Sequence, residues 1–160
     1  MTDRDYNECV RLHADGLYRF ILKNIKNGED ARDIVQTAFE KMWRKRETVD
    51  TVTSKSFLFT VAYNEMIDQL RKKHNRVTLT ERPLYQNRSD DHKKWLEIAF
   101  SQLTRIQRTL VLLKDWEGYS YEEIAAITGL NITQVKVYLH RSRLQLKKFF
   151  GSVENIIETY

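Results

Sequence analysis

Helix-breaking residues are rare in this chain. Its 160 residues include one proline and five glycines, so few positions force a turn or end a helix. The apolar residues recur every three or four positions instead of alternating, which is typical of helices that bury one face. We therefore expect an all-α protein made of two small helical domains joined by a flexible linker.

The composition is that of a soluble globular protein, with 41% hydrophobic and 31% charged residues. A single cysteine, Cys9, excludes an internal disulfide, and the polar first residues lack the apolar core of a signal peptide. No run approaches the roughly 20 apolar residues of a membrane-spanning helix. We expect a cytoplasmic chain without membrane insertion, and the net charge of +5 favours a polyanionic partner.

Residues 4–76 have the pattern of a first domain with three amphipathic helices. We expect the first helix to end near Gly28 in a left-handed conformation, and Ser54 to cap the third helix, which finishes in the basic run RKKHNR. Solvated helix faces usually interleave acids and bases. The second helix instead has a face of acids and amides with little base, formed by Asp33, Gln36, Thr37 and Glu40.

Residues 77–92 contain the only proline, several turn-forming residues and no sustained periodicity, so we interpret them as a linker. A second domain then covers residues 93–150, and a tail covers 151–160. Within this domain, Thr104 and Gln107 form the capping-box pattern of a helix that we expect to continue through Leu113.

The stretch EGYSYEEIAAITGLNITQVKVYLHRSRLQLKKFF predicts a helix-turn-helix. Ser120 and Glu123 form a second capping box, Gly129 permits a tight turn, and Asn131 is suited to cap the last helix. We expect the last helix to bury an apolar side made of Ile132, Val135, Leu139 and Leu146.

The last helix also concentrates positive charge. Between Asn131 and Lys148 there are five Lys or Arg residues and no Asp or Glu. Such a helix fits the major groove of DNA, with its N-terminal half at the base edges and its cations at the phosphates. A solvated cationic helix in a small bundle is the alternative. We favour DNA binding because capping, turn and one-sided charge coincide.

No catalytic motif stands out. The four histidines, at 13, 74, 92 and 140, lack metal-ligand spacing, and Cys9 falls in an apolar helical pattern that favours a buried structural thiol. There is no glycine-rich phosphate loop and no nucleophile elbow. We expect a protein that is not an enzyme and uses no metal, cofactor or small-molecule substrate.

Together, the two halves resemble the extracytoplasmic-function (ECF) group of bacterial sigma factors, the promoter-specificity subunits of RNA polymerase. The resemblance runs from about Asp5 to Phe150. It rests on EDARDIVQTAFEKMW and SFLFTVAYNEMIDQLRKK in the first half and LTRIQRTLVLLKDWEGYSYEEIAAITGLNITQVKVYLHRSR in the second. It implies that residues 4–76 form sigma region two, that residues 93–150 form sigma region four, and that the partners are core RNA polymerase and promoter DNA.

For region two, the resemblance implies two binding surfaces. The face of Asp33, Gln36, Thr37 and Glu40 would dock on the clamp coiled-coil of the polymerase, although Thr37 stands where the family commonly has an acid. The alternative is an ordinary solvated helix face. A loop and the third helix would read the minus-ten element as single-stranded DNA through Asp50, Thr51, Val52, Thr53, Ser54, Tyr63, Asn64, Arg71 and Lys72. Alternatively, Tyr63 packs in the core and the loop threonines only form a turn.

For region four, the resemblance implies contact with the polymerase flap and double-stranded readout of the minus-thirty-five element. The implied DNA-binding residues are Thr133, Gln134, Lys136, Val137, Tyr138, His140, Arg141 and Arg143. Among them, Val137, His140 and Arg141 would face bases. Family members often have a small polar residue at 137 and Arg at 138, so we expect this chain to recognise a different sequence.

Two other functions fit the residues less well. A stand-alone helix-turn-helix regulator would bind a symmetric site without polymerase, and a pure interaction module would have no effect on promoters. Neither needs a first domain with both an acidic face and a basic third helix. The resemblance further implies an anti-sigma factor that covers the same surfaces, through which the chain would be tethered to a membrane if that partner is membrane-bound.

Overall fold

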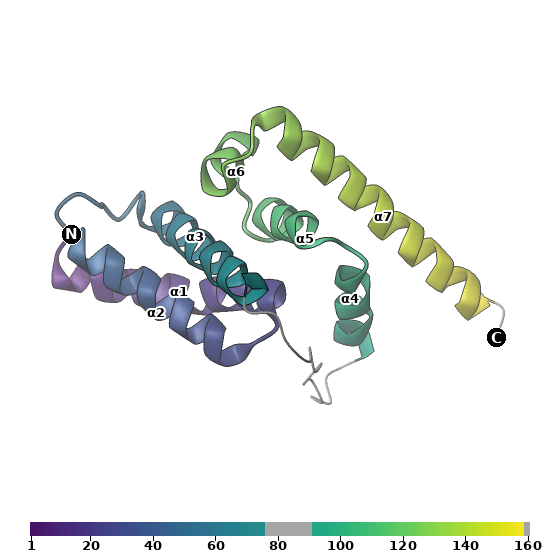
Figure 1. Ribbon diagram of the computed structural model, residues 1–160, viewed down its shortest axis with the longest axis horizontal. Coiled ribbons are helices and arrows are strands. Elements are labelled where there is room, and N and C mark those ends of the chain that lie inside the picture. Colours follow the sequence, from purple (N-terminus) through teal and green to yellow (C-terminus); the bar gives the residue numbers. More distant parts are fainter. Residues whose placement is uncertain (76–90, 159–160) are drawn as a thin grey trace. The chain divides into compact units, whose positions relative to one another are not determined.

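The computed structural model describes the backbone of residues 1–75 and 91–158, and the side chains of residues 1–74 and 94–152. The described residues form seven α-helices and one π-helical segment, and no strand occurs among them (Figure 1). This confirms the all-α prediction. The chain divides into two compact units, the first built from α1 to α3 and the second mainly from α4 to α7. Most of the expected linker, residues 77–90, lies outside the described residues.

The first unit is a bundle of α1 (Asp3–Ile25), α2 (Gly28–Arg44) and α3 (Ser54–Asn75), in which each helix packs against the other two. The rings of Phe20 and Phe59 meet at 5.2 Å between centroids in the core. Each helix contributes an i, i+3, i+4 stripe to this core, as the apolar spacing predicts. The buried side chains include Leu17, Phe20, Ile21, Ile34, Ala38, Met42, Leu58, Phe59, Ala62 and Met66.

The connection between α1 and α2 differs from the prediction. Lys26, and not Gly28, adopts the left-handed conformation (φ 55°) that ends α1. Gly28 is the first residue of α2, and the side chain of Asn27 caps that helix by accepting a hydrogen bond from the backbone N–H of Asp30. A Cβ at Gly28 would lie 3.3 Å from the Tyr18 hydroxyl, so the glycine permits a close approach to α1.

The start of α3 also differs from the prediction. Ser54 does not cap the helix but is its first residue, and it is fully buried. The backbone carbonyl of Thr53 accepts from the N–H of Phe57, which makes Thr53 the residue before the first turn. Ser54 is buried because it begins the core-facing stripe that continues through Leu58 and Ala62.

The second unit contains α4 (Asp91–Ser101), α5 (Arg105–Val111), the π-helical segment η1 (Leu112–Trp116), α6 (Tyr121–Thr128) and α7 (Ile132–Glu158). The predicted capping box of Thr104 and Gln107 is present. In η1 the N–H of Glu117 bonds to the carbonyl of Leu112, five residues back. The core of this unit includes Phe100, Leu103, Leu110, Leu113, Ile124, Val135 and Leu139.

The helix-turn-helix prediction is confirmed in its local details. The Ser120 hydroxyl accepts from the N–H of Glu123 at the start of α6, and Gly129 has a φ of 76° in the turn. Asn131 accepts from the N–H of Gln134, and the Gln134 amide oxygen accepts from the N–H of Asn131, which closes a capping box.

Two expectations about α7 need correction. Ile132 is 39% exposed, although its i, i+3 and i+7 spacing places it on the same side of the helix as the buried Val135 and Leu139. The helix also continues to Glu158, so the expected tail does not begin with a break in secondary structure. At the other edge of the domain, α4 already begins at Asp91, inside the expected linker.

Candidate partner and nucleic-acid interfaces

The acid-and-amide face predicted on the second helix lies on one side of α2. The acidic face (Asp33, Gln36, Thr37 and Glu40) spans two turns at i, i+3, i+4 and i+7, with three side chains exposed and Thr37 half-buried. The Gln36 amide donates to the Glu40 carboxylate at 3.1 Å, which orders the two side chains along the helix.

Two lysines of this unit are paired with carboxylates outside the acidic face. Lys41 bonds to Glu65 on α3, and Lys73 bonds to Asp30 at the start of α2. Within residues 1–74 and 94–152, no ion pair involves Asp33 or Glu40. The acidic face therefore retains two uncompensated carboxylates, an arrangement that suits a basic partner and repels DNA.

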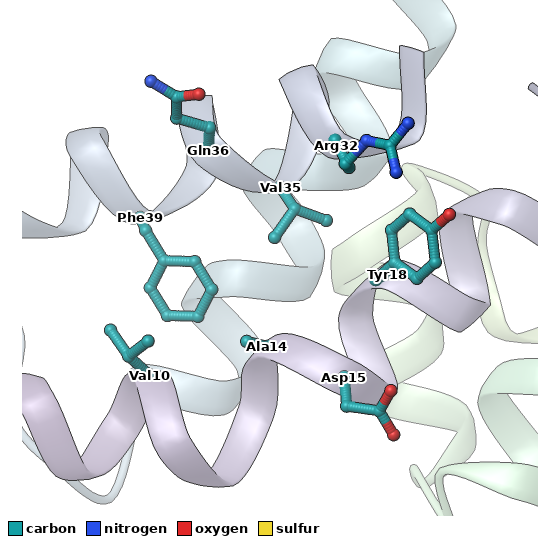
Figure 2. Close-up of a pocket in the computed structure, with 8 residues that line it drawn as sticks. All are labelled: Val10, Ala14, Asp15, Tyr18, Arg32, Val35, Gln36 and Phe39. Atoms are coloured by element: carbon teal, nitrogen blue, oxygen red, sulfur yellow. The ribbon is translucent and has the colours of Figure 1, made fainter. Parts of the chain in front are cut away.

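An open apolar groove of ≈ 440 Å³ lies between α1 and α2 beside the acidic face. In Figure 2, Val35 and Phe39 extend from α2 toward α1, whereas Gln36 points away from α1. The groove shares Gln36 with that face, so a partner on the face would also cover part of the groove. The lining residues are Val10, Ala14, Asp15 and Tyr18 from α1 and Arg32, Val35, Gln36 and Phe39 from α2.

The segment between α2 and α3 forms a small exposed loop. Val49, which follows the turn after α2, is buried, and Ser54 is buried where α3 begins. The residues between them, Asp50, Thr51, Val52 and Thr53, are all exposed. Ser54 therefore cannot contact DNA in this fold, which corrects its inclusion among the predicted minus-ten residues, whereas the other four are accessible.

The exposed side of α3 carries polar and basic residues. Asn64, Arg71 and Lys72 are exposed, and Arg71 lies 4.0 Å from Asp68 on the same side of the helix. Tyr63, which we expected to stack on bases, is only 8% exposed. Its position four residues after Phe59 and three before Met66 places its ring in the core stripe, so the alternative of core packing holds.

In the second unit, one side of α7 faces solvent. The open face of α7 is formed by Thr133, Val137, His140, Arg141 and Leu144, which recur at i, i+4, i+7, i+8 and i+11 and are all exposed. Leu144, at 53% exposure, extends this face one turn beyond the residues that we selected from the sequence. In a DNA major groove, a guanidinium can bond to guanine and an apolar group can contact the thymine methyl.

The remaining predicted residues of α7 are engaged with the unit itself. Arg143 donates to Asp115 at 2.9 Å, and this hydrogen bond raises the pKa of the Arg143 guanidinium. The Lys136 ammonium lies 5.4 Å from the centre of the Tyr121 ring. Tyr138 is half-buried, and Gln134 belongs to the capping box. These contacts hold two cations at the flank of the open face, where they suit phosphates better than bases.

The described residues contain no group of three His, Cys, Asp or Glu side chains that could hold a metal ion. No helix in that part of the chain is long and apolar enough to cross a membrane. Sequence reasoning missed the groove residues Tyr18 and Arg32, because a groove between helices depends on packing and leaves no signal at either residue alone.

Comparison with known proteins identifies both halves. The sigma-70 region 2 family matches residues 9–76, and the family described as sigma-70, region 4 matches residues 93–146. The RNA polymerase sigma factor SigV of Bacillus subtilis is 35% identical over 149 residues, which cover 88% of this chain and 90% of that protein. The ECF RNA polymerase sigma factor SigE of Mycolicibacterium smegmatis is 29% identical over 159 residues, covering 91% of this chain and 62% of that protein.

A solved structure supports the same assignment. The sigma factor RpoE in complex with the anti-sigma factor NepR from Bartonella quintana matches with a TM-score of 0.77 and 27% sequence identity, covering 92% of this chain and 98% of that one. Region two and region four thus occur here in order and across most of the chain. The protein belongs to the sigma-70 family and is an RNA polymerase sigma factor of the ECF type.

Proposed function

We propose that this sigma factor binds core polymerase through the acidic face of α2 and reads a two-part promoter with its two units. The observation that carries the proposal is the separation of charge between two helices. The acidic face presents uncompensated carboxylates, whereas α7 has five Lys or Arg residues and no Asp or Glu from Asn131 to Lys148. One helix suits a basic protein surface and the other suits DNA.

Core binding uses complementary charge. Asp33 and Glu40 face the arginines and lysines of the polymerase clamp coiled-coil, and Gln36 supplies a hydrogen-bonding group between them. Complementary charge fixes the orientation of the docked helix. The second unit contacts the flap, which sets its distance from the first unit on the promoter.

Minus-ten recognition uses the exposed residues between α2 and α3 together with the basic end of α3. Thr51, Val52 and Thr53 are accessible to an unstacked base, and Arg71 and Lys72 lie where they can hold the phosphates of the opened strand. Asn64 is exposed on the same side of α3 as Arg71 and offers both a donor and an acceptor.

Minus-thirty-five recognition uses the open face of α7. Arg141 is exposed and can bond to two acceptors of a guanine, whereas Val137 offers an apolar contact. Lys136 and Arg143 lie at the flank and serve the phosphate backbone. The chain itself supplies no catalytic group, because the polymerase performs nucleotide addition and the sigma factor selects the promoter and assists strand opening.

The proposal includes the cytoplasm of a bacterium as the site of action, because polymerase and promoter are there. An anti-sigma factor is a further proposed partner, supported by the Bartonella quintana sigma factor, whose structure contains one. If this partner sits in a membrane, it tethers the sigma factor there until release.

The test is transcription with purified components. Wild-type chain and bacterial core RNA polymerase are mixed with a library of random upstream sequences, and the transcribed templates are sequenced. We expect enriched two-part promoters. In Asp33→Arg and Gln36→Arg variants, core affinity should fall by more than about tenfold, because like charges at an interface cost several kcal/mol.

Glu8→Arg is the matched control, since Glu8 is an exposed carboxylate on α1 outside the acidic face, paired only with its helix neighbour Arg11. The control should bind core polymerase as the wild type does. The proposal is overturned if the wild type fails to bind core polymerase while the chain alone binds a palindromic DNA site.

A further inference from the structure

The loop between α2 and α3 is closed by its first and last exposed residues. The Asp50 carboxylate accepts two hydrogen bonds from Thr53, one from the backbone N–H at 2.7 Å and one from the hydroxyl at 2.8 Å. Both donors reach the same carboxylate oxygen. We call residues 50–53 the tip loop. Its two ends are therefore held together by a side chain that the sequence analysis assigned to DNA contact.

The core of the unit also holds the tip loop. The Ser54 hydroxyl donates to the carbonyl of Thr51 at 2.8 Å, and the buried Cys9 thiol donates to the Ser54 hydroxyl oxygen at 3.4 Å. Val49 is buried on the other side of the loop. Bonds from two directions thus fix the backbone on both sides of one residue, Val52.

Val52 is 88% exposed, more than any other large apolar side chain in the described residues. Its side chain contributes almost nothing to the core, and its β-branched shape leaves few rotamers. An exposed apolar side chain on an ordered loop costs little conformational entropy when a partner covers it. Val52 is therefore suited to contact a ligand and unsuited to stabilise the fold.

Asp50 is poorly suited to contact DNA directly. The hydrogen bonds from the backbone and side chain of Thr53 hold the pKa of the Asp50 carboxyl below its usual range, so the group stays ionised at neutral pH. A carboxylate facing phosphates is repelled, and one of its two oxygens is already taken up by the bonds from Thr53.

We propose that Asp50 is a positioning residue that fixes the tip loop through Thr53, so that Val52 contacts an unstacked thymine of the opened minus-ten strand. The inference rests on the proposed promoter function and deepens it. Val52 supplies an apolar contact to the thymine 5-methyl group, which cytosine and uracil lack. Thr51 and Thr53 flank the tip and leave Val52 as its only apolar side chain.

The first experiment separates the hydrogen bonds of Asp50 from its charge. Holoenzymes are formed from core polymerase and wild-type, Asp50→Asn or Asp50→Ala chains, and open complexes are counted on a promoter library randomised across the minus-ten element. The Asn amide oxygen can accept both bonds from Thr53. We expect Asp50→Asn to keep the wild-type rate and base preference. The Asp50→Ala variant should form about tenfold fewer open complexes, because the loss of hydrogen bonds to a charged group has an effect of this size.

The second experiment tests Val52 with deoxyuridine, which differs from thymidine by one methyl group. At the library position whose preference Asp50→Ala weakens, thymine is replaced by deoxyuridine on the opened strand. We expect the exchange to lower open-complex formation by the wild type several-fold. Open-complex formation by the Val52→Ala variant should not change. The inference is overturned if Asp50→Asn is as defective as Asp50→Ala, or if wild type and Val52→Ala respond alike to deoxyuridine.

A third measurement keeps the inference separate from the proposed function. In the free full-length chain, the Thr53 amide should be protected from hydrogen exchange in wild type and Asp50→Asn but not in Asp50→Ala. Equal protection in all three would remove the positioning role even if transcription behaves as expected. If the wild-type holoenzyme opens no promoter, the proposed function fails, and the positioning of the loop by Asp50 is still decided by this exchange measurement.

Discussion

Arg143 on α7 donates a hydrogen bond of 2.9 Å to Asp115 on η1, 28 residues earlier in the chain. Both side chains are partly exposed to water, with 48% and 40% of their surfaces accessible. An exposed pair of this kind contributes at most about 1 kcal/mol to folding. The pair also holds a cation at the flank of the open face of α7.

Replacing Asp115 with Ala should therefore alter DNA binding more than stability. The change removes a carboxylate that competes with the phosphates for the Arg143 guanidinium, so the holoenzyme should bind promoter duplex more tightly. The slope of log affinity against log salt should steepen by about one unit. Fluorescence anisotropy across a salt series measures both effects. Glu122→Ala, which removes an exposed carboxylate from α6, is the control and should leave the slope nearly unchanged.

Arg141→Ala and Lys136→Ala should have different effects on sequence preference. Loss of Arg141 from the open face should cost about 1–3 kcal/mol of discrimination at one minus-thirty-five base. Loss of Lys136 should weaken binding by a similar factor on all sequences, because a phosphate contact carries no sequence information. Binding to a library of single-base variants distinguishes these patterns. A uniform loss for Arg141→Ala would contradict a base contact.

Phe59→Ala should destabilise the first unit by about 3–5 kcal/mol, the usual cost of removing a buried aromatic ring. Phe59 is 1% exposed and meets Phe20 in the core. Leu12→Ala truncates an apolar side chain on the surface of α1 and should change stability by less than about 0.5 kcal/mol. Hydrogen exchange at the amides of α1 to α3 reports this unit alone. Similar losses in both variants would contradict the assigned core.

Tyr119 should make the second unit sensitive to alkaline pH. Burial raises the pKa of its phenol, with smaller contributions from the carboxylates of Glu117 and Glu123. In the unfolded chain the phenol ionises near a pH of about 10. The folded state therefore keeps its full stability below that pH and loses it as the pH rises further, because only the unfolded chain releases the proton. Denaturant unfolding at pH 8 to 11 should show the decline, and Tyr119→Phe should flatten it.

Features that depend on neighbouring residues were predictable from the sequence. The caps at Thr104, Ser120 and Asn131 and the turn at Gly129 all form as expected, because each bond links groups within three or four residues. The all-α class was likewise predictable from apolar residues that recur every three or four positions. For the same reason, the acidic face of α2 was visible as a pattern before any packing was known.

Features decided by packing between helices were not predictable. Ser54 and Tyr63 are polar residues whose types suggested a cap and an exposed ring, yet the core stripe of α3 buries both. Lys26, and not the glycine two residues later, ends α1 in a left-handed conformation, and Gly28 instead lies beside Tyr18. The groove between α1 and α2 depends on how the two helices pack, so no single residue in the sequence predicts it.

The open face of α7 carries no residue that the second unit needs for its own core, whereas Val135, Leu139 and Ser142 on the opposite side are buried. Mutations at Thr133, Val137, His140 and Arg141 can therefore accumulate with little loss of stability. A lineage could change the promoters it serves by altering a few such codons while the scaffold stays intact. Duplicated copies of a gene of this design would be free to diverge into regulators of separate gene sets.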